Sequence, residues 1–164
     1  MNGWLLDTNV VSELRKPTRN ADVVLWVDLQ PTISLHLSIV SIAEIRFGAA
    51  RTSSDVKRQR LNKWLDETLR PWFSGRIIGI DEDSILEWRQ ITEDGRTSGH
   101  TFSQPDLFIA VAARRHNLCI ATRNTADFIR AGVAVFNPWQ NVIESPGRKA
   151  QKINGVMTIE RLRR

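Results

Sequence analysis

Short apolar stretches alternate with amphipathic stretches along the first 140 residues of this 164-residue chain. The apolar stretches are typical of buried strands, whereas the amphipathic ones repeat at helical spacing. Strands that alternate with helices form a parallel sheet covered by helices, joined by right-handed crossovers. The pattern predicts strands over 3–6, 34–39, 76–80, 118–122 and 133–136, and helices over 10–16, 21–30, 41–50, 55–69, 83–93, 104–116 and 125–131.

Cap and breaker residues predict where several helices begin and end. Asn20 is a predicted N-cap, and Ser41 is predicted to open the third helix. Pro71 is expected to end a long helix, because proline cannot donate a backbone hydrogen bond. Residues 95–100 lie between two predicted helices, and we expect them to form a flexible connection.

The last stretch of the chain does not continue the alternation. Residues 141–164 contain a Ser-Pro-Gly break and show no clear periodicity. We therefore predict a folded domain over 1–140 and a C-terminal tail over 141–164. The tail is expected to be an appendage, either disordered or with a short helix near 157–162.

Size and composition are those of one globular domain with one core, since 41% of the residues are hydrophobic. The single cysteine, Cys119, lies in an apolar stretch without a partner for an internal disulfide, which fits a core position and a reducing compartment. No stretch approaches the roughly 18 apolar residues of a membrane span, and the N-terminus lacks the pattern of a secretory signal. We expect a soluble, cytoplasmic protein with no membrane partner.

The net charge of +5 favours a nucleic-acid partner, but its distribution qualifies that interpretation. Residues 141–164 carry six basic and two acidic side chains, whereas residues 1–140 carry seventeen and sixteen. The basicity therefore belongs largely to the tail, and the nearly neutral domain favours neither interpretation.

Four acids occupy comparable places in the predicted fold. Asp7 follows the first strand, Glu44 and Asp106 lie at the openings of two helices, and Asp127 follows the fourth strand. The C-terminal ends of parallel strands and the N-terminal ends of the following helices share one edge of the sheet, where such sheets place their sites. The four carboxylates are therefore predicted to converge there.

Each acid also has a purely structural explanation. Glu44 stands three residues after Ser41, as in a capping box. Asp106 suits the first turn of a helix, where an acid opposes the helix dipole. Asp7 suits a cap and Asp127 a first turn. Independent caps would be scattered over both edges of the sheet, so it is the combination that favours a site.

Converging carboxylates need a cation, because they otherwise repel one another. Oxygen ligands without histidine or cysteine suit Mg²⁺ or Mn²⁺ better than zinc. The three histidines of the chain have no zinc-like spacing. The pattern therefore predicts a site for a hard divalent cation.

Polar residues beside the acids would line the same edge. Thr8, Asn9, Thr122 and Asn124 are placed to orient the acids or to hold water. Arg123 is placed to reach a phosphate group. Turn and cap chemistry explains each of these residues equally well when it is taken singly.

Four motifs in this order carry a resemblance to a known family: Leu5-Leu-Asp-Thr-Asn, Ser41-Ile-Ala-Glu-Ile, Pro105-Asp-Leu-Phe-Ile-Ala and Thr122-Arg-Asn-Thr-Ala-Asp-Phe. They resemble the acid motifs of PIN-domain ribonucleases and, more narrowly, those of the VapC-type toxins of bacterial toxin–antitoxin pairs. The segments that begin at Trp72 and Val133 are similar to the FitB-like branch of that group. The resemblance covers about residues 3–139, and the ordered combination is specific although each motif is short.

The resemblance implies a PIN-like three-layer α/β fold, with a central, mainly parallel sheet of four to five strands flanked by helices. It implies an endoribonuclease that hydrolyses RNA phosphodiester bonds with Mg²⁺ or Mn²⁺. It also implies inhibition by a cognate antitoxin protein, and a homodimer or a larger toxin–antitoxin assembly.

The family's acids correspond, by motif, to Asp7, Glu44, Asp106 and Asp127. Asp7 and Asp106 are expected to bind the metal directly, with Glu44 and Asp127 completing the site directly or through water. Thr122 matches a polar site residue of the family. Pro105 stands where similar proteins often carry a small residue, although proline fits the first turn of a helix.

Two alternatives remain open. Phosphatases of the haloacid-dehalogenase type also begin with a strand that ends in Asp-x-Asp, but Asn9 replaces the second acid here. A non-catalytic module that binds RNA or a protein partner through its basic tail is the alternative from another class. Motifs of P-loop, dinucleotide-binding and serine-hydrolase proteins are missing from the sequence.

Overall fold

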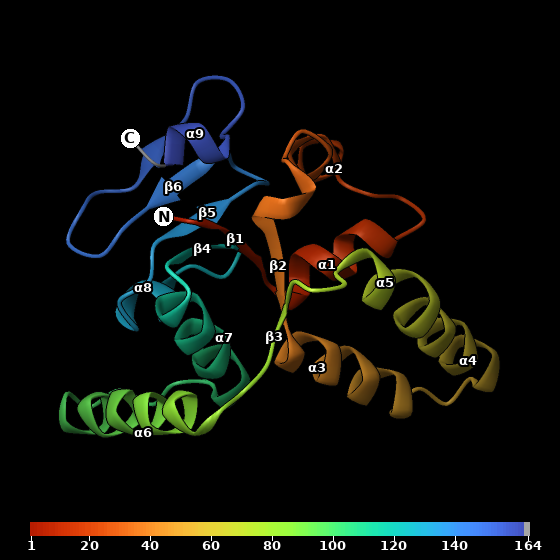
Figure 1. Ribbon diagram of the computed structural model, residues 1–164, viewed down its shortest axis with the longest axis horizontal. Helices are drawn as coiled ribbons and strands as arrows, with labels where there is room; N and C mark the ends of the chain where they lie inside the picture. The colour runs from red at the N-terminus through yellow and green to blue at the C-terminus, as the bar shows by residue number, and fades with distance from the viewer. Residues whose placement is uncertain (163–164) are drawn as a thin grey trace.

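Five short apolar segments form the parallel part of a central sheet, as Figure 1 shows for the computed structural model, which describes residues 1–162. Their order across the sheet is β3-β2-β1-β4-β5. Two antiparallel strands continue the sheet beyond β5. The strands are β1 (Gly3–Leu6), β2 (Leu35–Ser38), β3 (Ile77–Ile78), β4 (Leu118–Ala121), β5 (Val135–Asn137), β6 (Val142–Glu144) and β7 (Gln151–Lys152).

Helices cover both faces of this sheet (Figure 1). The helices are α1 (Thr8–Arg15), α2 (Ala21–Asp28), α3 (Ile39–Ala50), α4 (Asp55–Trp64), α5 (Arg70–Trp72), α6 (Glu82–Thr97), α7 (Gln104–Arg115), α8 (Ala126–Arg130) and α9 (Ile159–Leu162), with a 3-10 turn at Thr32–Ser34 and a π-helical turn at Leu65–Leu69. The predicted α/β class with a mainly parallel sheet flanked by helices is confirmed.

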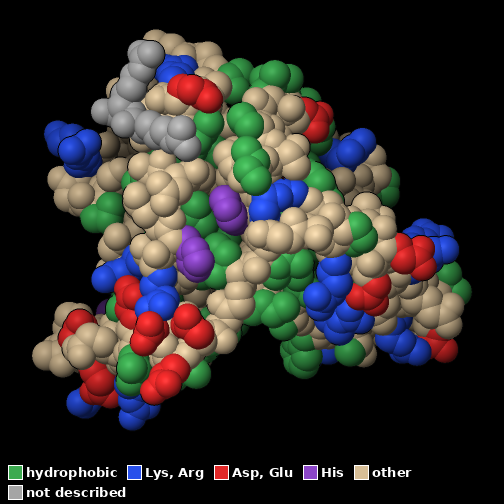
Figure 2. Space-filling model, in the orientation of Figure 1, with side chains coloured by type: hydrophobic (Ala, Val, Ile, Leu, Met, Phe, Trp, Pro, Cys, Tyr) green, Lys and Arg blue, Asp and Glu red, His purple; other side chains and the backbone are tan. Residues whose placement is uncertain are grey.

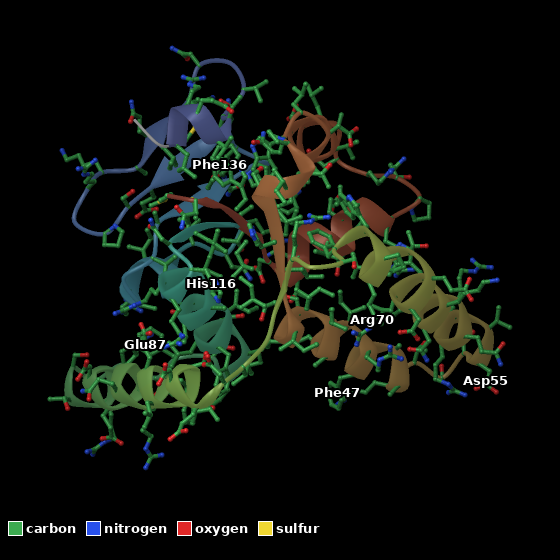
Figure 3. The ribbon with its side chains drawn as sticks, viewed as in Figure 1. Phe47, Asp55, Arg70, Glu87, His116 and Phe136 are labelled. Atoms are coloured by element: carbon green, nitrogen blue, oxygen red, sulfur yellow. The ribbon has the colours of Figure 1, made fainter. Side chains whose placement is uncertain are left out.

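The alternation of side chains along β1 separates two apolar cores. Trp4 and Leu6 point into a core shared with α1, α2, α4 and the C-terminal segment, whereas Leu5 points into a core shared with α6, α7 and α8. Phe136 of β5, labelled in Figure 3, packs in the first core, with its ring centroid 5.1 Å from that of Trp26. The sheet therefore forms the middle of three layers, with one apolar core and its helices on each face, and β1 contributes side chains to both cores.

Gly3 allows β2 to approach β1 closely. A Cβ atom at Gly3 would lie 2.5 Å from the carbonyl oxygen of Ser34, which is closer than packed atoms come. The glycine therefore sets the start of the β1–β2 pairing, in which Trp4 lies beside Leu35. That pairing brings the ends of β1 and β2 to the same edge.

The start of α3 differs from the prediction. Ser38 is the N-cap, and its Oγ accepts a hydrogen bond from the backbone N–H of Val40 at 3.1 Å. Ser41 lies inside the helix, is fully buried, and its Oγ has no partner among the described residues. The predicted capping box of Ser41 and Glu44 is therefore wrong, because the N-cap of the helix stands three residues earlier, at Ser38.

Two other helices run longer than predicted. Helix α6 continues to Thr97, through part of the expected flexible connection, because Gly95 lets the ring of Phe102 pack against the helix backbone. The helical stretch that begins at Asp55 continues past Pro71 to Trp72. A π-helical turn precedes the proline.

Residues 141–162 are part of the folded molecule, whereas the sequence left open whether this stretch is a disordered appendage. Strand β6 pairs antiparallel with β5, and β7 with β6. The predicted short helix is present as α9, and Met157 and Ile159 are buried in the first core. We call residues 141–162 the C-terminal extension. Periodicity missed it because its strands are only three and two residues long.

Asn141 fixes the start of the C-terminal extension. Its backbone has a positive φ of 55°, a conformation that asparagine tolerates better than most residues. Its side-chain amide donates to the carbonyl oxygens of Ile153 and Gly155, both at 2.7 Å. One residue therefore holds the return of the chain after β7 against the beginning of β6.

Charged side chains of both signs gather over α6 and over the α4–α5 region, as Figure 2 shows. Several are paired, as in the contacts of Arg114 with Glu87 and of Arg46 with Asp66. Exposed pairs of this kind add little to stability. None of the helices within residues 1–162 has both the length and the apolar character needed to cross a membrane.

Candidate active site

The predicted acids gather where the chain order of the strands reverses direction. Strands β1 and β4 are neighbours, and from them the sheet extends to β2 and β3 on one side and to β5 on the other. Such a switch point leaves a crevice at the strand C-termini. A cavity of about 330 Å³ lies there, and its lining is Asp7, Thr8, Asn9, Ser12, Lys16, Glu44, Asp106, Arg123 and Asn124. We call it the acid cavity.

Asp7 is both a helix cap and a buried acid. It follows β1 directly and caps α1, with its Oδ1 accepting a hydrogen bond from the backbone N–H of Thr8 at 2.6 Å. Only 4% of the residue is exposed. Burial, followed by weaker repulsion from Asp106 and Glu44, raises the pKa of Asp7 to about 6, against the opposing effect of its hydrogen bonds.

Thr122 and Asn9 hold the second oxygen of Asp7. The hydroxyl of Thr122, fully buried at the end of β4, donates to Oδ2 of Asp7 at 2.7 Å. The side-chain amide of Asn9 donates to the same oxygen at 2.6 Å and to the Thr122 hydroxyl oxygen at 2.9 Å. The backbone N–H of Asn124 donates to that hydroxyl oxygen as well, at 3.0 Å. These bonds fix the direction in which the Asp7 carboxylate faces.

Glu44 lies in the second turn of α3 and faces α1 instead of its own helix start. Its Oε2 accepts a hydrogen bond from the Thr8 hydroxyl at 2.7 Å. With the capping box absent, no cap role accounts for this glutamate. The contact joins α1 and α3 across the acid cavity.

Asp106 lies in the first turn of α7, one residue after Pro105. Burial raises the pKa of Asp106 first, and repulsion from Glu44 and then from Asp127 raises it further. The proline does not displace the acid from the cavity, whose lining includes Asp106. Proline in the first turn of a helix sacrifices no hydrogen bond.

Asp127 lies near Asp106 but outside the lining of the acid cavity. Its Oδ1 is 3.3 Å from Nε2 of His100 and 3.7 Å from Nη1 of Arg130. The same Arg130 nitrogen lies 3.0 Å from Nδ1 of His100. Asp127 therefore has a cationic partner in Arg130, whereas the three acids of the cavity form no ion pair among residues 1–162.

The acid cavity also contains residues that the sequence did not single out. Ser12 and Lys16 line it together with Thr8, since the three stand four residues apart along α1. That spacing is visible in the sequence, but no motif extends from Thr8 to Ser12 and Lys16. Nζ of Lys16 is 2.6 Å from Oε2 of Glu13, and the guanidinium of Arg123 lies over the ring of Trp139.

The residues of the acid cavity fit a hard divalent cation. Three carboxylates face one space whose lining has no histidine or cysteine, and oxygen ligands suit Mg²⁺ or Mn²⁺. Oδ1 of Asn9 is buried there without a partner among the described residues. Within residues 1–162, no three His, Cys, Asp or Glu side chains stand close enough to form a ready-made metal cluster.

Comparison with known proteins places these features in a family context. The PIN domain family matches residues 4–134. The toxin FitB of Neisseria gonorrhoeae is 39% identical over 137 residues, which are 84% of this chain and 99% of that protein. The VapC ribonuclease Y4jK of Sinorhizobium fredii is 35% identical over 136 residues, which are 83% of this chain and 97% of that protein.

A solved structure shares the architecture. The crystal structure of FitAcB from Neisseria gonorrhoeae superposes with a TM-score of 0.77 at 40% identity, covering 83% of this chain and 98% of that one. The family match ends at residue 134, so the C-terminal extension lies outside it.

Proposed function

This chain belongs to the PIN-domain family, and from that premise we propose that it is a metal-dependent endoribonuclease that acts as the toxin of a toxin–antitoxin pair. Relatives named as a toxin and as a VapC ribonuclease support this proposal. The observation that carries it is the acid cavity, where three carboxylates converge at the switch point of the sheet.

Asp7 and Asp106 would hold Mg²⁺ or Mn²⁺ directly, and Glu44 and Asp127 would complete the site directly or through water. Once bound, such a cation polarises the scissile phosphate, lowers the pKa of a bound water and stabilises the charge on the leaving oxygen. The raised pKa values of Asp7 and Asp106 support this assignment, because a nearby cation favours the ionised carboxylates.

The remaining polar residues of the site position the acids and the substrate. Thr122 and Asn9 orient the Asp7 carboxylate through their hydrogen bonds. Thr8 holds Glu44 in the same way. Arg123 and Lys16 bring positive charge to the acid cavity, where they would attract an RNA phosphate. Asn124 completes this wall of the site.

The proposal includes a protein partner. The solved structures of FitAcB and of FitAB bound to a DNA fragment support a cognate antitoxin that inhibits this chain. We also propose a homodimer or a larger toxin–antitoxin assembly. In this proposal residues 1–140 supply the nuclease chemistry, and the C-terminal extension supports the domain.

The direct test is cleavage of defined RNAs by the purified protein, with Mg²⁺, with Mn²⁺ and with a chelator. We expect metal-dependent cleavage that Asp7→Asn lowers by roughly 100-fold or more. Asp28→Asn is the matched control, because Asp28 is an exposed acid on α2 outside the cavity. Cleavage that persists in chelator would overturn the metal mechanism. A folded wild-type protein that binds RNA without cutting it would instead be a binding module.

A further inference from the structure

A second cavity is lined in part by the C-terminal extension. Its volume is about 640 Å³, and its lining comes from α2, from residues 138–142 and from Lys152, Gly155 and Val156 of the extension. Figure 1 shows the extension, in blue, packed next to β5 and towards α2. We call it the Trp139 cavity. Residues of the extension form part of its wall, so it depends on a segment outside the family match.

Arg123 connects the two cavities. It lines the acid cavity, and its guanidinium carbon lies 5.6 Å from the ring centroid of Trp139, which lines the second cavity. Arg123 is exposed and Trp139 is partly exposed. An RNA strand with one phosphate at the acids would therefore contact the guanidinium of Arg123 and then the ring of Trp139 where it leaves the acid cavity.

The chemistry of the Trp139 cavity suits a nucleotide. Indole and guanidinium groups stack on nucleobases of any sequence, and Trp26 and Leu25 add apolar surface to the lining. Lys152, which pairs with Val142 across the sheet, supplies a cation in the same lining. Neither Arg123 nor Lys152 forms an ion pair among residues 1–162. Asp22 also lines the cavity, and a carboxylate accepts hydrogen bonds from the exocyclic amino group of a base.

We propose that the Trp139 cavity is a nucleotide subsite that binds the single-stranded RNA adjoining the cleaved bond, with one base stacked on Trp139 and a phosphate beside Lys152. This inference rests on the proposed ribonuclease function and adds to it the place where the flanking strand binds. A protein partner is less well suited, because Arg123, which lines the acid cavity, lies over the ring of Trp139, and Lys152 adds a second cation to the lining of the Trp139 cavity.

The test measures RNA binding apart from cleavage. Fluorescein-labelled oligoribonucleotides are titrated by anisotropy against protein in the Asp7→Asn background, with a dinucleotide and a strand of about ten nucleotides. Trp139→Leu should weaken binding of the longer strand by roughly tenfold, because leucine fills space without a stacking face. Trp139→Phe should retain most of the affinity. The dinucleotide, which is too short to occupy both cavities, should bind all three proteins alike.

The charge of Lys152 is tested separately, through the salt dependence of RNA binding. Lys152→Gln should lower the slope of log affinity against log salt by about 0.7, the value for one phosphate contact on a single strand. Lys57→Gln and Trp72→Leu are matched controls, because both residues lie outside the two cavities. Melting curves check that each variant is folded.

The outcomes separate the subsite from the nuclease function. If the wild type cleaves RNA but Trp139→Leu binds the longer strand as tightly as Trp139→Phe does, the subsite is overturned and the nuclease stands. If the wild type binds RNA through Trp139 without cleaving it, the subsite stands and the nuclease fails. If RNA binding is unchanged by Trp139→Leu while affinity for an antitoxin falls, the cavity belongs to a protein interface and the subsite is overturned.

Discussion

Asp7 is at once a helix cap and a site acid, and its position in the sequence is compatible with either role. It caps α1, as the structural explanation predicts, and it is also a buried acid beside two other carboxylates. A cap at a helix N-terminus gains from its negative charge, whereas burial disfavours that charge. The raised pKa shows that burial outweighs capping at this residue.

The pKa of Asp7 predicts how stability depends on pH without metal. Its folded pKa of about 6 lies above its ordinary value of 3.8, so ionisation costs the folded state more than the unfolded one. The free energy of unfolding should therefore fall by about 3 kcal/mol as the pH rises from about 4 to 6, and stay lower above that. Urea unfolding in chelator across this range measures the fall.

Asp7→Asn is the control for this dependence, since asparagine does not ionise. The variant should lose the Asp7 part of the fall, while the smaller part due to Asp106 remains. Mg²⁺ added at pH 7.5 should stabilise the wild type and not the variant, because only the wild type binds it well. Identical pH dependence in the two proteins would contradict the assignment of the raised pKa.

Thr122 should control the pH at which the site becomes active. Its hydrogen bond lowers the pKa of Asp7, so Thr122→Val should raise that pKa and move the acidic limb of the pH–rate profile to higher pH. RNA cleavage should therefore drop more at pH 6 than at pH 8. Thr122→Ser, which keeps the hydroxyl, should behave like the wild type, and a uniform loss at every pH would instead indicate a purely structural role.

The sequence predicted the convergence of acids better than it predicted their neighbours. Asp7, Glu44 and Asp106 line one cavity because strand ends and helix starts share an edge. Asp127 is near them but outside the lining, since its partners His100 and Arg130 come from loop and helix positions that no pattern connects. Contacts between side chains far apart in the sequence could not be read from spacing.

At the scale of elements, the start of α3 shows how a local motif misleads. Ser41 and Glu44 have capping-box spacing, yet the strand gives way to the helix at Ser38, where the β2 pairing with β3 ends. Tertiary pairing thus decides the boundary, and the motif does not. The five parallel strands and the main helices were predictable because apolar periodicity reflects the two faces of the sheet.

Two serine variants test that boundary. Ser38→Ala should cost about 1 kcal/mol of unfolding free energy, the value of a lost N-cap. Ser41→Ala should cost little or stabilise, because it removes a buried hydroxyl without a partner among the described residues. Chemical denaturation of both variants measures the difference. A larger loss of unfolding free energy for Ser41→Ala than for Ser38→Ala would argue that Ser41, and not Ser38, is the N-cap.

Two glycines in helices should respond in opposite directions to alanine. At Gly95 in α6 a Cβ would lie 2.8 Å from Cε2 of Phe102 and 3.1 Å from the carbonyl oxygen of His100, so Gly95→Ala should destabilise by about 1–3 kcal/mol. At Gly48 in α3 a Cβ meets nothing within 4 Å, so Gly48→Ala should stabilise by up to about 1 kcal/mol. Thermal melts of the pair separate close packing from helix propensity.

At the scale of the whole molecule, the C-terminal extension completes the first core. The carbonyl oxygen of Met157 accepts hydrogen bonds from Nε1 of Trp26 at 2.9 Å and from Nε2 of Gln30 at 3.0 Å. Oε1 of Gln30 accepts in turn from Nε1 of Trp4 at 3.0 Å. The extension is thus linked by buried polar contacts to β1, the middle one of the five parallel strands.

Deletion of residues 141–164 should therefore destabilise the domain as well as remove positive charge. The deletion leaves the Trp26 and Gln30 donors without Met157 and uncovers the apolar surface under Met157 and Ile159. Losses of about 1–3 kcal/mol for a buried donor and 2–5 kcal/mol for a large buried side chain predict a melting temperature lower by roughly 10 °C or more. Met157→Ala should reproduce part of this fall, whereas Lys149→Gln, at an exposed position outside any helix or strand, should not. An unchanged melting temperature after the deletion would show that the domain folds without the extension.

The role of the extension in RNA binding is better judged from single substitutions such as Lys152→Gln, because the deletion is expected to lower stability and so to change RNA binding indirectly.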